Sequence, residues 1–200
     1  MKFIFKKDTP TRGHGLLEKF LAKKRAEKAN SLISENLRKG RILDIGCGTT
    51  PYFLTNIEFK RKYGIDPFIK QSSNKNIKLL NVAIEKEKMP FEDDFFDVIT
   101  MLAVFEHIEE KDIEIVTREI RRVLKKDGLF IITTPSIWAK FPLWLFSRLG
   151  FVSKIEINDH RHALSRNKIA DFLIRSGFNI HKIKSGYFEL SFNMWFTANK

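Results

Sequence analysis

Hydrophobic residues recur along the chain with two different periods, so helices and strands should alternate. Apolar residues spaced as on one face of a helix predict helices at residues 16–37, 112–125 and 165–174. Gly40 ends the first helix, and Asp127-Gly128 is the expected left-handed stop of the second. Ser165 is a good N-cap for the third.

Short apolar segments between these helices predict strands. Five are expected at residues 41–45, 62–65, 77–81, 96–101 and 129–133, and two closing strands at 179–183 and 187–196. The first five are apolar on both sides, which suits a parallel sheet buried on both faces. The last two should form an antiparallel hairpin at its edge. The pattern therefore predicts the α/β class.

The composition fits one folded domain. The chain has 200 residues, 43% of them hydrophobic and 30% charged. A single cysteine, Cys47, leaves no internal disulfide and no Cys-based zinc site, and we expect no metal. No segment has the apolar core of a signal peptide or a membrane span. We therefore expect a cytoplasmic protein.

The net charge of +12 is unevenly distributed. Residues 1–41 carry twelve basic and four acidic side chains, whereas residues 81–114 carry three basic and eleven acidic ones. Basic ends around an acidic middle fit either solvated helix faces or an anionic partner such as a phospholipid surface. No aromatic RNA-binding motif accompanies the charge, so we do not expect a nucleic-acid partner.

The segment from Arg41 to Gly48 carries the main chemical signal. A short strand leads directly into a glycine pair, and Gly46 and Gly48 let a nucleotide-like ligand approach the backbone. Asp44 lies two residues before the first glycine, where it can receive an ammonium group and would repel a pyrophosphate. A dehydrogenase fingerprint would also need a third glycine at Pro51. These features favour an adenosyl amino acid over a dinucleotide.

A second acidic residue supports the same ligand. Asp66 ends the next predicted strand, 18 residues beyond Gly48. A carboxylate at this place can accept hydrogen bonds from both hydroxyls of a ribose.

Five segments resemble, in order and spacing, the class I S-adenosylmethionine-dependent methyltransferases, and in particular their small type 11-like subgroup. These segments are LDIGCG, YGID, MPFEDDFFDVI, VFEHI and IRRVLKKDGLFIITTP, within residues 40–135. The resemblance implies a Rossmann-like, mostly parallel seven-stranded sheet with helices on both faces. It also implies S-adenosylmethionine as the cofactor.

The resemblance further implies a set of residues around this cofactor. Those at the methionine end are Asp44, Gly46, Cys47, Gly48 and Leu102; Asp66 binds the ribose; Val82 and Ala83 line the adenine. Thr50 stands where the family usually has a third glycine, and Val82 where it often has Asp or Asn. The loss of one hydrogen bond to adenine costs about 1 kcal/mol, so a functional but weaker site is expected.

Few side chains are candidates for catalysis. His107 follows the fourth parallel strand and can act as a general base for a hydroxyl acceptor. Its alternative role is that of a loop histidine that caps the next helix. Cys47 is expected to be a small buried filler rather than a nucleophile.

Residues 136–165 are expected to form a lid that recognises the methyl acceptor. The aromatic residues Trp138, Phe141 and Trp144 can line an apolar pocket, contact an anionic membrane surface, or simply pack over the site. His160 and His162 can recognise the acceptor, bind a metal, or belong to a structural loop; the first and last roles are favoured because further metal ligands are missing.

These observations predict a single methyltransferase domain. Residues 1–40 form a basic helical cap, residues 41–135 the cofactor-binding core, residues 136–165 the lid, and residues 166–200 a closing helix and strands. We expect methyl transfer to a small-molecule or lipid-like acceptor, with peripheral membrane contact as an option. Two alternatives remain: a catalytically weak binding or regulatory protein, and a nicotinamide-dependent oxidoreductase.

Overall fold

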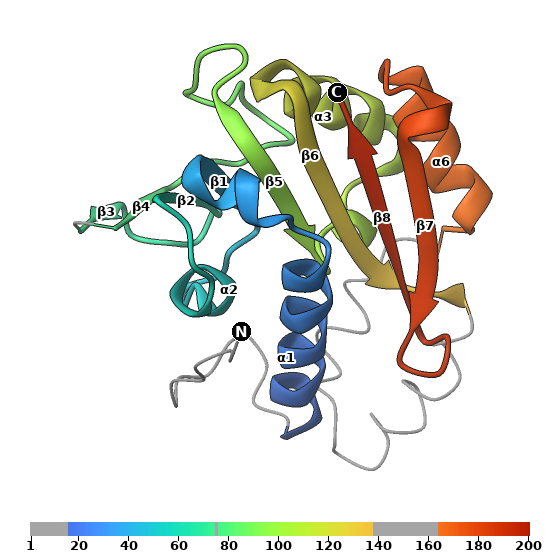
Figure 1. The fold of residues 1–200 in the computed structure, drawn as a ribbon, viewed down its shortest axis with the longest axis horizontal. Helices are drawn as coiled ribbons and strands as arrows, with labels where there is room; N and C mark the ends of the chain where they lie inside the picture. The colour runs from blue at the N-terminus through green and yellow to red at the C-terminus, as the bar shows by residue number, and fades with distance from the viewer. Residues whose placement is uncertain (1–15, 75, 138–163) are drawn as a thin grey trace.

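A mixed β-sheet runs through the computed structural model, which describes residues 16–74, 76–137 and 164–200 (Figure 1). Its strands lie in the order β3-β4-β2-β1-β5-β6-β8-β7. Their bounds are β1 (Arg41–Ile45), β2 (Arg61–Ile65), β3 (Ser72–Ser73), β4 (Ile77–Leu80), β5 (Phe96–Leu102), β6 (Leu124–Pro135), β7 (Ile183–Phe188) and β8 (Asn193–Asn199). The strands β4, β2, β1, β5 and β6 are parallel, and β8 is antiparallel to both β6 and β7. The order reverses between β1 and β5, so a ligand crevice is expected at their carboxyl ends.

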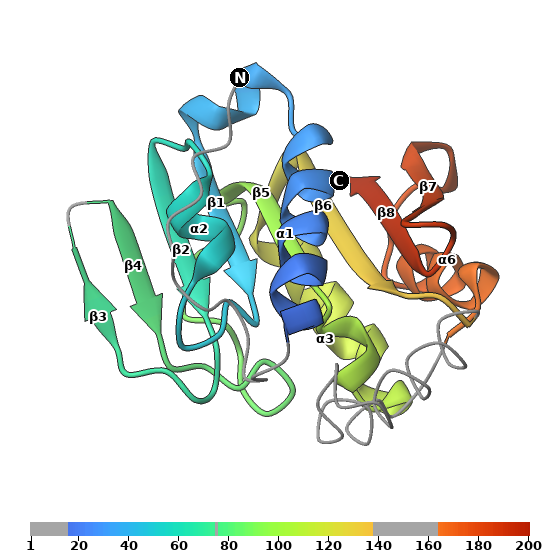
Figure 2. The ribbon, with the colours of Figure 1, turned by 90° about the horizontal axis from the view of Figure 1, so that it is seen from below.

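Helices cover both faces of the sheet (Figure 2). They are α1 (Leu16–Ser31), α2 (Tyr52–Asn56), α3 (Glu110–Val123) and α6 (Arg166–Arg175). None of these described helices has the length and apolar character needed to cross a bilayer.

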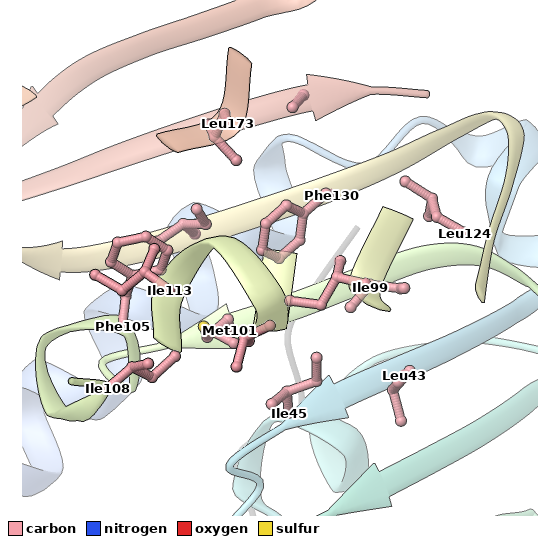
Figure 3. Close-up of a cluster of buried hydrophobic side chains, with 14 of the residues drawn as sticks. Leu43, Ile45, Ile99, Met101, Phe105, Ile108, Ile113, Leu124, Phe130 and Leu173 are labelled. Atoms are coloured by element: carbon pink, nitrogen blue, oxygen red, sulfur yellow. The ribbon is translucent and has the colours of Figure 1, made fainter. Parts of the chain in front are cut away.

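Two hydrophobic cores form because successive strand residues point to opposite faces. Ile42, Val98 and Ile131 pack with α1 and α2 on one face. On the other face, residues such as Leu43 and Ile99 pack with α3 and α6 (Figure 3). Each inner strand is thus buried on both sides, as its apolar sequence predicts.

The predicted sheet, with helices on both faces and an antiparallel C-terminal hairpin, is confirmed. It has eight described strands rather than seven, because the two-residue strand β3 pairs with β4 at the edge. The helix expected at residues 16–37 is divided: α1 ends at Ser31, and Glu35–Lys39 form a 3-10 helix. The guanidinium of Arg38 donates to the carbonyls of Asn30 and Ile33, at 3.0 and 3.1 Å. These two backbone carbonyls at the break between the helices thus have hydrogen-bond partners.

Other boundaries differ for local reasons. The helix expected at residues 112–125 ends at Val123 because Leu124 already pairs with Phe96 in the sheet. Asp127 does adopt the left-handed conformation, but within β6 rather than at a helix end. The closing strands lie later than the expected 179–183 and 187–196, because residues 189–191 all have positive φ and form the turn.

Arg122 of α3 fixes the acidic segment that leads into β5. Its guanidinium donates to Asp93 and Glu119, each at 2.6 Å, and to the carbonyls of Met89 and Phe91. Glu119 in turn accepts a hydrogen bond from the backbone N–H of Met89 at 2.9 Å. This network explains how an arginine in IRRVLKKDG supports the segment MPFEDDFFDVI.

We expect Arg122→Lys to lower the free energy of unfolding by about 1–2 kcal/mol, because an ammonium cannot reproduce the planar fork of bonds. Arg118→Lys is the matched control: Arg118 is 62% exposed and pairs with Glu114, whereas Arg122 is 18% exposed. Urea unfolding measures both variants. Equal losses in the two variants would contradict the role given to Arg122.

Candidate cofactor site

The loop after β1 turns so sharply that two of its residues occupy the left-handed region. Gly46 and Gly48 have φ values of +71° and +70°. The N–H groups of Gly46 and Cys47 donate to the carbonyl of Ile65, at 2.8 and 3.3 Å, and fasten the loop to the end of β2. A Cβ atom at Gly46 would collide with the side chain of Val104. Glycine is therefore required here both for backbone conformation and for space.

Cys47 fills space beneath this loop. It is buried against the core on the α1 and α2 face, and burial raises the pKa of its thiol. A Cβ atom at Gly64, in β2, would lie 2.7 Å from the Cys47 sulfur and 2.8 Å from a methyl of Leu79. The glycine of YGID thus makes room for the cysteine of LDIGCG. This environment favours the thiol over a nucleophilic thiolate.

Asp44 is a buried carboxylate at the carboxyl end of β1, only 4% exposed. Its Oδ1 accepts a hydrogen bond from the hydroxyl of Thr100, its neighbour in β5, at 2.7 Å. Burial raises the pKa of Asp44 from 3.8 to about 7; the Thr100 hydrogen bond opposes this rise, and the charge of Asp66 adds to it. The carboxyl therefore changes charge near neutral pH, and a cation beside it would favour the ionised form.

Asp66 lies at the end of β2 and is equally buried. Its Oδ2 accepts from the N–H of Gly48 at 3.2 Å, and its Oδ1 from the N–H of Phe68 at 2.9 Å. The carboxylate thus joins the glycine loop to the loop after β2. Two acidic side chains, from adjacent strands, are held around one glycine turn.

The segment after β4 contains the two residues expected near adenine. Val82 is buried in the core on the α3 face, and the N–H of Ala83 donates to the Glu87 carboxylate at 2.8 Å. The side chain of Asn81 donates to the carbonyls of Pro67 and Ile69, at 3.1 and 3.0 Å. Asn81 therefore ties this segment to the loop that carries Asp66.

The end of β5 approaches the same loop from the other side. Leu102 is half-buried beside the core of the α1 face, and Ala103 has a φ of +56°, which is uncommon for a non-glycine residue. The next residue is Val104, whose side chain leaves no room for a Cβ atom at Gly46. Thr50 is not among the described residues with positive φ, so this position does not require glycine for its backbone conformation.

His107 lies in a 3-10 helix, Phe105–His107, just after β5. Glu109, two residues after His107, is the N-cap residue of α3. The adjacent Glu106 is buried and accepts a hydrogen bond from the Thr134 hydroxyl at 3.0 Å. This bond holds the turn that carries His107 against β6.

Some predicted residues lie outside the described part of the chain. These are Trp138, Phe141, Trp144, His160 and His162, together with most of the predicted lid and residues 1–15 of the N-terminal cap. Sequence reasoning missed Thr100, Asn81 and the pair formed by Glu106 and Thr134. A lone hydroxyl in the apolar strand FDVITML was the available signal for Thr100.

The acidic glycine loop at the reversal point of the sheet, together with strand β8 lying antiparallel between β6 and β7, is the arrangement of a class I S-adenosylmethionine-dependent methyltransferase. A family model described as a methyltransferase domain matches residues 17–183, so the chain belongs to this family.

Solved structures support the fold. An S-adenosylmethionine-dependent methyltransferase from Mesorhizobium loti superimposes with a TM-score of 0.67 at 16% identity, over 90% of this chain and 100% of that one. A possible histamine N-methyltransferase from Thermotoga maritima gives 0.63 at 19% identity, over 88% and 87%.

Curated relatives match over shorter stretches. A sterol 4-C-methyltransferase from Caenorhabditis elegans is 36% identical over 110 residues, which are 50% of this chain and 31% of that protein. An uncharacterised protein from Methanocaldococcus jannaschii is 32% identical over 111 residues, 54% of this chain and 42% of that protein. The chain thus spans less than half the length of these two relatives.

The raised pKa of Asp44 should make the protein less stable as pH rises. The folded state retains its proton up to about pH 7, whereas the unfolded state loses it near 3.8, so stability falls between these values and then levels off. Relative to Asp44→Asn, the wild type should lose about 2.5 kcal/mol between pH 5 and pH 8. Urea unfolding of both proteins at each pH measures this. A pH-independent difference would contradict a strongly raised pKa.

Proposed function

We propose that the chain binds S-adenosylmethionine at the carboxyl ends of β1 and β2 and transfers its methyl group to a small-molecule or lipid-like acceptor. The observation that carries this proposal is the pair Asp44 and Asp66, buried on either side of the glycine turn. Two carboxylates here suit a ligand with an ammonium group and a ribose, and they disfavour the pyrophosphate of a dinucleotide.

Each acidic residue has a distinct part in this proposal. Asp44 receives the ammonium of the methionine portion, and the ion pair offsets the cost of ionising a buried carboxyl. Asp66 receives the ribose hydroxyls; a carboxylate offers about four lone-pair sites, so its two bonds to backbone N–H groups are compatible with this role. Gly46 and Gly48 allow the backbone to approach the ligand closely.

The adenine would lie over the segment after β4. Val82 supplies apolar packing there and offers no side-chain hydrogen bond. The N–H of Ala83 is already bonded to Glu87, so adenine must compete with this carboxylate or rely on packing alone. Both features support an affinity below that of relatives with Asp or Asn at this position.

When bound, the cofactor supplies an already activated methyl group, so the protein mainly has to align the acceptor and exclude water. Leu102 would position the methionine end from β5. For an acceptor that must lose a proton, we propose His107 as the general base, because its turn directly follows β5 and is held against β6 by the hydrogen bond from Thr134 to Glu106.

The methyl acceptor in this proposal is a lipid-like molecule. The sterol methyltransferase relative and the aromatic residues Trp138, Phe141 and Trp144 favour a lipid-like molecule, with His160 and His162 as further contacts. The basic N-terminal segment would suit approach to an anionic membrane from the cytoplasmic side.

We expect Asp44→Asn to weaken S-adenosylmethionine binding by about 10- to 100-fold, because it removes a charge-assisted contact. Calorimetric titration measures this, with Asp171→Asn on the exposed side of α6 as the matched control.

Wild-type protein with methyl-labelled cofactor and a cell extract should label a lipid or metabolite fraction. His107→Ala should reduce the labelling about 100-fold if the acceptor needs a base.

Two results would contradict the proposal. The first is no binding to wild-type protein at millimolar cofactor. The second is binding without any labelled product, which would instead support a binding or regulatory protein that keeps the fold without turnover.

A further inference from the structure

Four of the seven buried polar side-chain atoms that lack a hydrogen-bond partner in the described part of the chain come from α1, β6, β8 and the turn between β7 and β8. They are Nε of Arg25, Oγ1 of Thr133, Oε1 of Glu189 and Oδ1 of Asn193. Thr133 is 0% exposed and Asn193 is 4% exposed. Buried polar groups normally have partners, so such a group of unpaired atoms calls for a ligand or water.

The sheet register places two of these residues together. Thr133 of β6 is opposite Trp195 of β8, and Pro135 is opposite Asn193. Met194 packs into the core on the α3 face, so Asn193 and Trp195 point to the α1 face. Thr133 points the same way, because Ile131, two residues earlier, packs in the core on that face.

The turn after β7 brings in the third residue. The amide nitrogen of Asn193 donates to Oε2 of Glu189 at 2.5 Å, which leaves Oε1 unpaired. Glu189, Leu190 and Ser191 all have positive φ, a strained conformation for three successive non-glycine residues. Ser136 holds this turn in place, because its hydroxyl donates to the carbonyl of Ser191 at 2.6 Å.

Helix α1 closes the site from the other side. The ammonium of Lys28 lies 4.6 Å from the centre of the Trp195 ring, and the charge of Arg25 acts on Glu189. Figure 1 shows that α1 and the β7–β8 turn both extend past the carboxyl end of β5. The unpaired polar atoms thus come from elements that lie next to one another: α1, β6, β8 and the β7–β8 turn.

This site adjoins the proposed methyl donor. Thr133 is the Cα partner of Leu102 in β5, the residue proposed beside the methionine end. Thr100, which bonds Asp44, lies two residues earlier on the same strand. The unpaired atoms therefore lie one strand away from the reacting end of the cofactor.

We propose that these four residues bind a hydroxyl-bearing part of the methyl acceptor, an inference that rests on the proposed function. The N–H of Arg25 needs a hydrogen-bond acceptor, whereas the oxygens of Glu189 and Asn193 need donors; Thr133 can serve as either. A hydroxyl group both donates and accepts. A phosphate diester offers no donor, and neither does a quaternary ammonium.

The test compares Thr133→Val with the matched control Thr197→Val. Thr197 is buried in β8, opposite Ile131, two positions farther from the carboxyl end. The probe is a cell extract whose ester lipids have been saponified, with methyl-labelled cofactor. At dilute extract, Thr133→Val should reduce the labelling rate about 10-fold or more, because it removes a hydrogen bond to the acceptor. Arg25→Met should do the same, and Thr197→Val should not.

Cofactor affinity and melting temperature distinguish a loss of acceptor binding from a loss of structural stability. Thr133→Val should leave the cofactor affinity unchanged and should keep or raise the melting temperature of the ligand-free protein, since the lost hydroxyl has no partner there. A lower melting temperature with a matching loss of activity would overturn the proposal, because the hydroxyl would then be structural. An unchanged labelling rate would overturn it as well.

The chemical class is tested by blocking the acceptor. Acetylation of the extract should abolish labelling, and mild alkaline removal of the acetate esters should restore it; acetylated amines would not be restored. Labelling that survives acetylation would overturn the hydroxyl requirement. A wild-type protein that labels nothing in any extract would overturn the proposed function and this inference with it, whereas an active wild type with an unaffected Thr133→Val would overturn this inference alone.

Discussion

The hydrogen bond between Thr100 and Asp44 is the interaction on which the candidate site depends. It joins β1 to β5 at the reversal point of the sheet and holds a carboxyl group that would otherwise be buried without a partner. Burial makes that carboxyl a weak acid, and the nearby Asp66 makes it weaker still. Burial and the charge of Asp66 both disfavour the ionised form of Asp44. A cation at this place, such as an ammonium group, would stabilise the ionised carboxylate against both effects.

The surrounding residues follow from this constraint. The two carboxyls lie at the ends of the paired strands β1 and β2, and the loop after β1 can fold back onto the end of β2 only because Gly46 and Gly48 adopt positive φ. The loop lies close to β2 only because Gly64 leaves room for Cys47. Strand β6 pairs with β5 on the side away from β1. Its residue Thr133 points to the α1 face of the sheet and is one of the residues with an unpaired polar atom. The proposed cofactor and acceptor sites are thus neighbouring positions along one edge of the sheet.

The sequence predicted those parts that local patterns determine. Apolar strands, the glycine loop, Asp44 and Asp66 were all visible in it, because strand burial and turn geometry act over a few residues. The Thr100 bond joins residues 56 positions apart, and no pattern in one sequence marks such a pair. The same holds for Glu189, whose role depends on a strained turn and on α1. The C-terminal strands are shifted because the turn falls at residues 189–191, which all have positive φ although none of them is a glycine that would have marked the turn in the sequence.

The most direct measurement is the number of protons released when S-adenosylmethionine binds, obtained by calorimetry at pH 7 in buffers of different ionisation enthalpy. With a pKa of about 7, Asp44 should release about half a proton per site as it becomes ionised. Thr100→Val, which loses the bond that lowers this pKa, should bind more weakly and release more, approaching one proton. Binding without proton release, or equal release by the two proteins, would contradict a buried Asp44 as the partner of the ammonium group.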